Sequence, residues 1–211
     1  MWRMEAILDV YAEDYDPFCP QVCFDEVPYQ LVSETRQSQA VQPGKPARYD
    51  YEYRRQGTCN LFMMFEPLAS WRQVKVTQRR TKLDFAQCMK ELVDVHFPNA
   101  EKIRLVLDNL NIHTPAALYE AFDPAEARRL VRKLEFHYTP VHGSWLNMAE
   151  IEISTLSRQC LDRHLPDVDI VEREVTAWHQ RRNAQKATVD WQFTTTKARD
   201  KLKHLYPSRS G

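Results

Sequence analysis

The sequence contains no apolar run that approaches the ~18 residues needed to span a membrane. Its start also lacks a basic segment followed by an apolar one, which is the pattern of a secretory signal. We therefore expect a soluble protein of the cytoplasm with no membrane contact. Of its 211 residues, 43% are hydrophobic and 11% aromatic, which is enough for one domain with a packed core.

Paired cysteine spacing is missing as well. The five cysteines are an odd number, and no two of them form a C-x-x-C motif. Cys19 and Cys23 lie four residues apart, but the second pair of ligands that a zinc site would need is absent from the sequence. We interpret these two residues as reduced, partly buried thiols.

The chain has no excess of charge of either sign, so its net charge gives no indication of a nucleic-acid partner. The distribution of charge is more informative. Residues 1–27 carry seven acidic side chains and one basic one, a net −6, whereas residues 173–204 carry eight basic and three acidic ones, a net +5. The C-terminal surface could therefore face a polyanion, although a solvated helix face is the simpler interpretation.

Apolar and alternating runs predict five strands, preceded by a short apolar run at 22–24 that ends in Asp25. The strands are expected at 47–55, 58–65, 73–77, 103–108 and 134–138, with a turn at Gln56-Gly57 between the first two. Helices are expected over 2–12, from the cap Thr81 to Pro98, from Thr114 and from Asp123 onwards, and over 146–161, 168–186 and 195–205.

This order of elements fits an α/β fold with a mixed five-stranded sheet. Three strands joined by hairpins are antiparallel, two strands after crossovers are parallel, and helices cover both faces. The arrangement is that of an RNase H-like core. We expect a single domain over residues 1–211, with its core at about 20–162 and a C-terminal helical extension at about 163–211.

Two apolar runs end in aspartate, at Asp25 and at Asp108. Aspartate rarely enters a core unless its charge is compensated, and residues just past the ends of adjacent strands can meet at one sheet edge. A third acid is available from the helix after the last strand, as Glu150 or Glu152. These two lie about 200° apart on a helix, so they cannot both face one site. We assign Glu150, one turn beyond Asn147, to the inward stripe and interpret Glu152 as solvated.

Three carboxylates brought together repel one another, and burial raises the cost. Protonation would relieve the repulsion, and so would a hard divalent cation. Oxygen ligands of this kind suit Mg²⁺, and two such ions ~4 Å apart assist the in-line displacement of a phosphoryl group. The sequence therefore predicts a magnesium site formed by Asp25, Asp108 and Glu150.

Several blocks of the sequence resemble the catalytic domain of DDE transposases, in the branch of bacterial insertion sequences within the mariner superfamily. They are VCFDEVPYQL, LVLDNLNIHTP, HGSWLNMAEIEISTLSRQCL, RRN and WQFTTTKARDKL. The resemblance runs from about residue 5 to Pro207. It implies that Asp25, Asp108 and Glu150 are the metal-binding catalytic triad, with Asn147 and Glu150 forming the Asn-x-x-Glu signature.

By the same resemblance, the chain is a Mg²⁺-dependent transposase that cleaves and transfers DNA strands. It would use two Mg²⁺ ions, which Mn²⁺ could replace, and would act as a homodimer on transposon ends and target DNA at the bacterial nucleoid. Only about two dozen residues precede Asp25, so we expect the family's N-terminal helix-turn-helix region to be absent from this chain.

Two alternatives remain open. The chain could be a truncated or domesticated remnant that binds DNA or protein without catalysis, or a generic RNase H-like nuclease. His113, His142 and Ser144 lie in loops next to the acids, and we interpret them as forming ordinary loop hydrogen bonds.

Overall fold

A computed structural model describes residues 1–35 and 52–206. It contains one five-stranded sheet in the order β3-β2-β1-β4-β5. The strands are β1 (Gln21–Glu34), β2 (Tyr53–Glu66), β3 (Trp71–Thr77), β4 (Ile103–Leu107) and β5 (Leu134–Tyr138). β1, β2 and β3 are antiparallel, whereas β4 is parallel to both β1 and β5. The predicted mixed sheet is confirmed.

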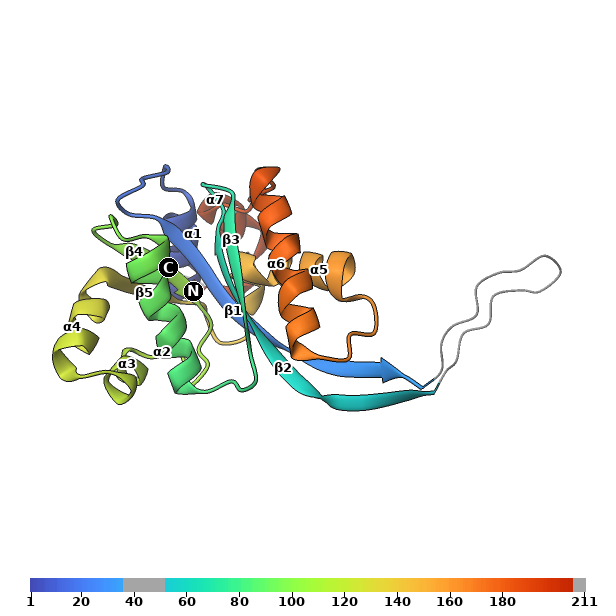
Figure 1. Ribbon diagram of the computed structural model, residues 1–211. Helices are drawn as coiled ribbons and strands as arrows, with labels where there is room; N and C mark the ends of the chain where they lie inside the picture. Colours follow the sequence, from blue (N-terminus) through green and yellow to red (C-terminus); the bar gives the residue numbers. More distant parts are fainter. Residues whose placement is uncertain (36–51, 207–211) are drawn as a thin grey trace, which may run out of the picture.

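Helices cover both faces of this sheet (Figure 1). One layer consists of α2 (Lys82–Glu91), α3 (Pro115–Ala121) and α4 (Pro124–Lys133). The other consists of α1 (Trp2–Tyr11), α5 (Met148–Leu156), α6 (Val168–Ala184) and α7 (Thr195–Lys201). Short helical turns follow α2 at Leu92–His96, precede α5 at Ser144–Leu146, follow α5 as η3 (Ser157–Leu161) and follow α7 at Lys203–Leu205.

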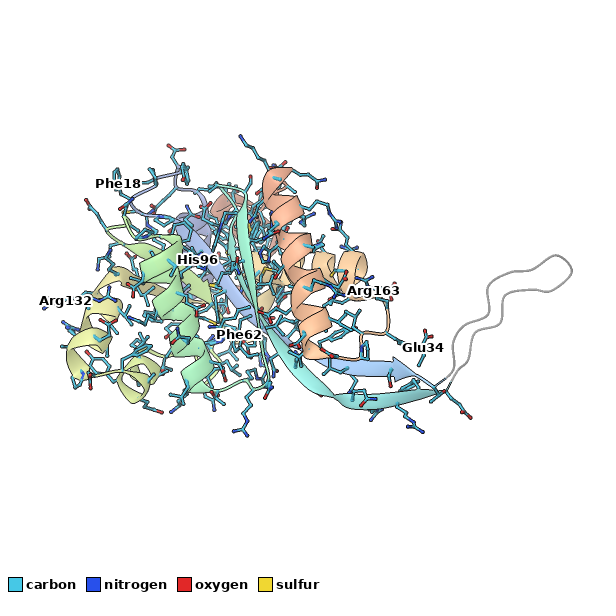
Figure 2. All side chains as sticks on the ribbon, in the orientation of Figure 1. Phe18, Glu34, Phe62, His96, Arg132 and Arg163 are labelled. Atoms are coloured by element: carbon cyan, nitrogen blue, oxygen red, sulfur yellow. The ribbon has the colours of Figure 1, made fainter. Side chains whose placement is uncertain are left out.

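The two layers bury separate apolar clusters, and side chains fill the space between sheet and helices (Figure 2). Phe24, Phe62 and Phe85 belong to the α2–α4 layer. Met63 and Trp178 belong to the α5–α7 layer. Because successive residues of a strand face opposite sides, β1 contributes to both clusters, and this strand carries the first predicted site residue.

The first strand of the antiparallel part was predicted wrongly. It is β1, which begins in the short apolar run at 22–24 and continues to Glu34, whereas part of the predicted strand 47–55 lies outside the described residues. Gln56-Gly57 is also not a turn. Gly57 has a φ of +105° inside β2, where the pairing with β1 shifts between Gln30 and Val32. Glycine adopts this conformation at little cost, so a bulge lets the strand continue.

All five cysteines are free thiols, and Cys23 is fully buried. Burial raises the pKa of the Cys23 thiol to about 12, which keeps it protonated, in agreement with the interpretation as a reduced thiol. Within residues 1–35 and 52–206, no helix is long and apolar enough to cross a membrane.

The predicted cap at Thr81 is confirmed and gives a first testable expectation. The Thr81 side chain accepts a hydrogen bond from the Asp84 N–H, and the Asp84 carboxylate accepts one from the Thr81 N–H at 2.8 Å. Thr114 also begins a helix, but its side chain makes no capping bond. We expect Thr81→Ala to lower the free energy of unfolding by about 1 kcal/mol in urea titrations, and Thr114→Ala to have a much smaller effect. Equal effects would contradict the assignment.

Candidate functional site

The register of the parallel strands brings the first two predicted acids together. Cys23 of β1 lies opposite Val106 of β4. Two residues further along each strand, Asp25 and Asp108 are level with one another at the same edge of the sheet. Asp25 lies within β1, and Asp108 is the first residue after β4. The short parallel pairing of β1 with β4 therefore places the carboxylate that follows the buried strand β4 near the carboxylate carried by β1.

Asn147 connects the third predicted acid to the same edge. This fully buried residue caps α5, where its side-chain oxygen accepts a hydrogen bond from the Ala149 N–H. Its amide nitrogen donates to the carbonyl oxygen of Phe24 at 2.8 Å. Phe24 directly precedes Asp25, so this bond holds the beginning of α5 against β1. Glu150 lies in the first turn of α5, close to that contact.

The pKa of Asp25 reflects its burial first and the negative charges around it second. Burial, followed by the negative charges of Glu26, Asp108 and Glu150, raises the pKa of Asp25 to about 7, although the Glu26 N–H donates to its Oδ1 at 2.8 Å. A carboxyl group with such a pKa is half protonated near neutral pH. The fold thus places like charges where they oppose one another's ionisation.

His113 lies on the other side of Asp108 and bridges two carboxylates. Its Nδ1 is 2.7 Å from Asp108 Oδ1, and its Nε2 is 2.8 Å from Glu26 Oε2. The ring is fully buried and packs against Phe24 and Phe85, with centroids 5.3 and 5.1 Å away. Its carbonyl oxygen accepts a hydrogen bond from the Tyr138 hydroxyl. This histidine therefore does more than form the ordinary loop contact predicted for it.

The bridge determines the charge of both partners. Burial disfavours the imidazolium, but the contacts with Asp108 and Glu26 outweigh it and raise the pKa of His113 to about 9. Burial likewise disfavours the Asp108 carboxylate, but its hydrogen bonds with His113 and the Leu110 N–H lower its pKa. Asp108 is therefore ionised at neutral pH, while Asp25 is at the midpoint of its titration.

The family model described as "DDE superfamily endonuclease" matches residues 20–172, which include all three acids. The chain belongs to this family. Among curated proteins, none matches it.

Several solved structures of a mariner transposase have the same fold as this DDE endonuclease. "Crystal structure of the Mos1 mariner paired end complex with Mn" matches with 15% identity and a TM-score of 0.58, over 87% of this chain and 56% of that one. "Crystal structure of the Mos1 Strand Transfer Complex" matches with 14% identity, the same TM-score and the same coverage. The chain thus spans about 56% of the length of these transposase chains. The likeness supports the RNase H-like fold.

The interpretation of Glu152 as solvated is wrong. This residue is 1% exposed, and it forms ion pairs with Arg72 and Arg182. Glu150, by contrast, is only partly buried and lies on the side of α5 from which its charge acts on Asp25. Glu150 and Glu152 do face different sides of α5, as their ~200° separation predicts, but both sides of this helix pack against other parts of the protein. Glu152, on the second packed side, forms its ion pairs with arginines that are far away in the sequence.

A groove of about 350 Å³ begins at Asp108 in this DDE endonuclease domain. His142 and Ser144 line it, together with Thr139, Pro140 and neighbouring loop residues. His142 has a φ of +60°, so the loop makes a sharp bend there. Both residues thus line the same groove as Asp108, one of the three predicted acids.

The donor set of the site fits a hard divalent cation, because its oxygen donors are carboxylates and the charges of Asp108 and Glu150 act on Asp25. The Oδ1 atoms of Asp25 and Asp108 accept hydrogen bonds, while within the described chain their Oδ2 atoms have no hydrogen-bond partner. In the same part of the chain, no three His, Cys, Asp or Glu side chains already form a group that could hold a metal ion.

The raised pKa of Asp25 predicts how metal-free stability depends on pH. A carboxyl group with a folded pKa near 7 stabilises the fold below its unfolded pKa of ~3.9, and this contribution is lost as the pH rises to 7. Asp25→Asn removes this titration. We expect its melting temperature in EDTA to exceed that of the wild type at pH 8, with the difference disappearing towards pH 4. An Asp25→Asn variant that is less stable at pH 8 would contradict the raised pKa of Asp25.

Proposed function

We propose that this chain is the catalytic domain of a transposase, which cleaves DNA and transfers the cut strand in a metal-dependent reaction. The observation that carries the proposal is the effect of Asp108 and Glu150 on Asp25: within a DDE endonuclease domain, two acids from distant parts of the chain lie near enough to a third to raise its pKa. Neighbouring like charges destabilise a fold, so they are uncommon where a protein needs only stability, whereas phosphoryl-transfer sites require them.

Asp25, Asp108 and Glu150 would hold the metal, in the form of two Mg²⁺ ions that Mn²⁺ could replace. When bound at such a site, divalent ions supply activation of the attacking oxygen and stabilisation of the leaving oxygen in an in-line displacement at phosphorus. The Mos1 structures were solved with Mn and with Mg, which supports this choice of ions.

The residues of the chain have distinct tasks in this proposal. Asp108 stays ionised because His113 holds its Oδ1, so its other oxygen is available as a ligand. Asp25 gives up its proton when a cation binds, since its pKa lies near 7. Glu150 is carried to them by α5, whose start Asn147 ties to β1.

We further propose transposon ends and target DNA as substrates and a homodimer as the active form, within a bacterial insertion sequence. The Mos1 structures that match include a paired end complex, a "paired-end complex with left transposon end" and a strand transfer complex, which supports a DNA substrate. The net positive charge of residues 173–204 would favour such a polyanionic substrate.

Incubation with DNA tests the proposal. We expect the protein to nick supercoiled plasmid in MgCl₂ or MnCl₂ and to join an oligonucleotide with a free 3′-hydroxyl to plasmid, with neither reaction in EDTA. Nicking without joining would favour a generic RNase H-like nuclease. The absence of both reactions at millimolar metal would refute catalysis by this chain.

An inactive remnant is the second candidate, and one observation favours it: among the described residues, no three potential ligands are already placed around one point. The melting temperature in a titration with MnCl₂ separates the candidates. A competent site stabilises the fold by about 2.7 kcal/mol at a metal concentration 100 times its dissociation constant. An inactive remnant would show no shift.

A further inference from the structure

A cluster of buried charges lies on the side of α5 opposite Glu150. The Glu152 carboxylate is 1% exposed, and Arg182 of α6 approaches it with two nitrogens at 2.8 and 3.2 Å. Arg72 of β3 is fully buried and lies 3.0 Å from the same carboxylate. Glu152 is thus held by two arginines, one from each neighbouring element.

Both arginines are themselves fixed. Arg72 packs over the ring of Phe65, and Arg182 over that of Trp178. The Asn183 side chain accepts a hydrogen bond from the Arg72 N–H at 2.9 Å and donates one to the Arg72 carbonyl at 2.8 Å, in the manner of an added strand. The cluster thereby joins α5, α6 and β3 through directional contacts.

A buried cluster of charges holds two helices together at a high cost in desolvation free energy. Replacing a buried ion pair by well-packed apolar residues is often neutral or stabilising, because desolvation of the charges consumes most of their attraction. Apolar contacts, however, let a helix rotate or slide by small amounts. A bidentate arginine contact restricts the orientation of the carboxylate and of the helix that carries it.

We infer that the Arg72–Glu152–Arg182 cluster positions Glu150 for metal binding, which makes helix α6 part of the catalytic apparatus. Glu150 and Glu152 are two residues apart on opposite sides of α5, so the orientation of one determines that of the other. Asn147 fixes only the beginning of the helix, and the cluster fixes its rotation. The match to the DDE endonuclease family covers residues 20–172 and therefore does not extend to Arg182. The inference rests on the proposed function.

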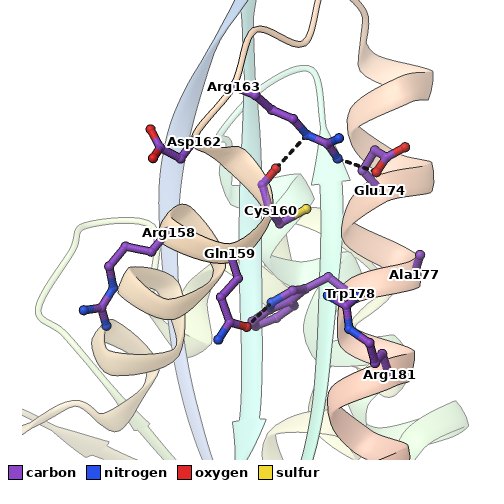
Figure 3. A pocket seen from close by; sticks show the side chains of 9 residues that line it. All are labelled: Arg158, Gln159, Cys160, Asp162, Arg163, Glu174, Ala177, Trp178 and Arg181. Carbon is purple, nitrogen blue, oxygen red and sulfur yellow. Dashed lines mark hydrogen bonds and ion pairs between the residues drawn. The ribbon is translucent and has the colours of Figure 1, made fainter.

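Arg181 provides a matched control. It is the neighbour of Arg182 on α6, but its side chain is exposed and lines a cavity between η3 and α6 instead of contacting Glu152 (Figure 3). Arg181→Met removes the same charge from the same turn. Val175→Ala is a second control, because it removes buried apolar volume from α6 and leaves the charged cluster intact.

The test is Mn²⁺ binding to the metal-free protein, followed by the electron paramagnetic resonance of free Mn²⁺. We expect Arg182→Met and Glu152→Gln to bind Mn²⁺ about 10–100-fold more weakly than the wild type, the range found when groups that orient metal ligands are removed. Arg181→Met and Val175→Ala should stay within about twofold. A merely structural role would lower stability in Val175→Ala and Arg182→Met alike, without this difference in affinity.

Circular dichroism establishes that each variant is folded at the temperature of the titration. Should Arg182→Met or Glu152→Gln fail to fold, Arg182→Lys keeps the charge but loses the bidentate geometry, and we still expect at least about tenfold weaker binding. Wild-type affinity in the folded cluster variants would overturn the inference and leave the proposed function standing. A wild-type protein that binds no Mn²⁺ would overturn both.

Discussion

Asp108→Asn is expected to abolish DNA cleavage and joining while leaving the fold intact. Asparagine keeps the oxygen that accepts hydrogen bonds from His113 and from the Leu110 N–H, so the turn after β4 has no reason to change. The negative charge that a cation requires is lost, however. Metal ligation contributes several kcal/mol of transition-state stabilisation, and about 4 kcal/mol corresponds to a rate loss of about 10³-fold.

Single-turnover nicking of plasmid in MnCl₂ measures this effect, with Asp123→Asn as the matched control. Asp123 also follows a structured segment and begins a helix, but its side chain makes no capping bond and it lines a different cavity from Asp108. The control should nick DNA at the wild-type rate. Wild-type activity in Asp108→Asn would show that the assignment of this acid is wrong.

His113→Ala is expected to produce the largest loss of stability among the residues around the site. The substitution removes a buried ring between Phe24 and Phe85 and leaves Glu26, whose side chain is 3% exposed, with Arg80 at 3.4 Å as its remaining cationic partner. Breaking a buried charge pair by removing one partner costs about 3–5 kcal/mol. We expect a loss of this size in urea denaturation at pH 7.

The effect should depend on pH in a defined direction. The pKa of His113 is raised to about 9, so its stabilising contribution is complete below the unfolded pKa of ~6.5 and is lost as the pH rises through 9. The difference between wild type and His113→Ala should therefore shrink between pH 7 and pH 10. His164→Ala is the control, because His164 is 48% exposed and 3.8 Å from its partner Glu34. A constant difference across this range would argue against an imidazolium bridge.

Most strands of the sheet could be predicted from the sequence because the patterns that indicate a strand are local. The apolar run of β4 and the alternation in β5 each lie within a few consecutive residues, and the hairpin order limits how they can be arranged. The exception was the hairpin of β1 and β2. Gly57 was taken as a turn, since glycine favours turns and bulges alike and only the partner strand distinguishes them.

The sequence predicts the three acids as site residues, but it does not predict the polar contacts around them. His113 binds Glu26, which is distant in sequence, and Glu152 binds Arg72 and Arg182. Such pairs leave no periodic trace, because each partner is a single polar residue in an unrelated element. Asn147 was placed inside a helix predicted over 146–161, whereas it caps α5, and its bond to Phe24 depends on how α5 meets β1.

Anomalous diffraction from crystals soaked in MnCl₂ tests most directly whether the three carboxylates form one metal site. At the manganese absorption edge, difference density is expected between the side chains of Asp25, Asp108 and Glu150, and the same soak of Asp108→Asn should show it weakened or gone. Density confined to other parts of the surface, with these three side chains turned away from one another at millimolar manganese, would contradict the site on which the proposed chemistry depends.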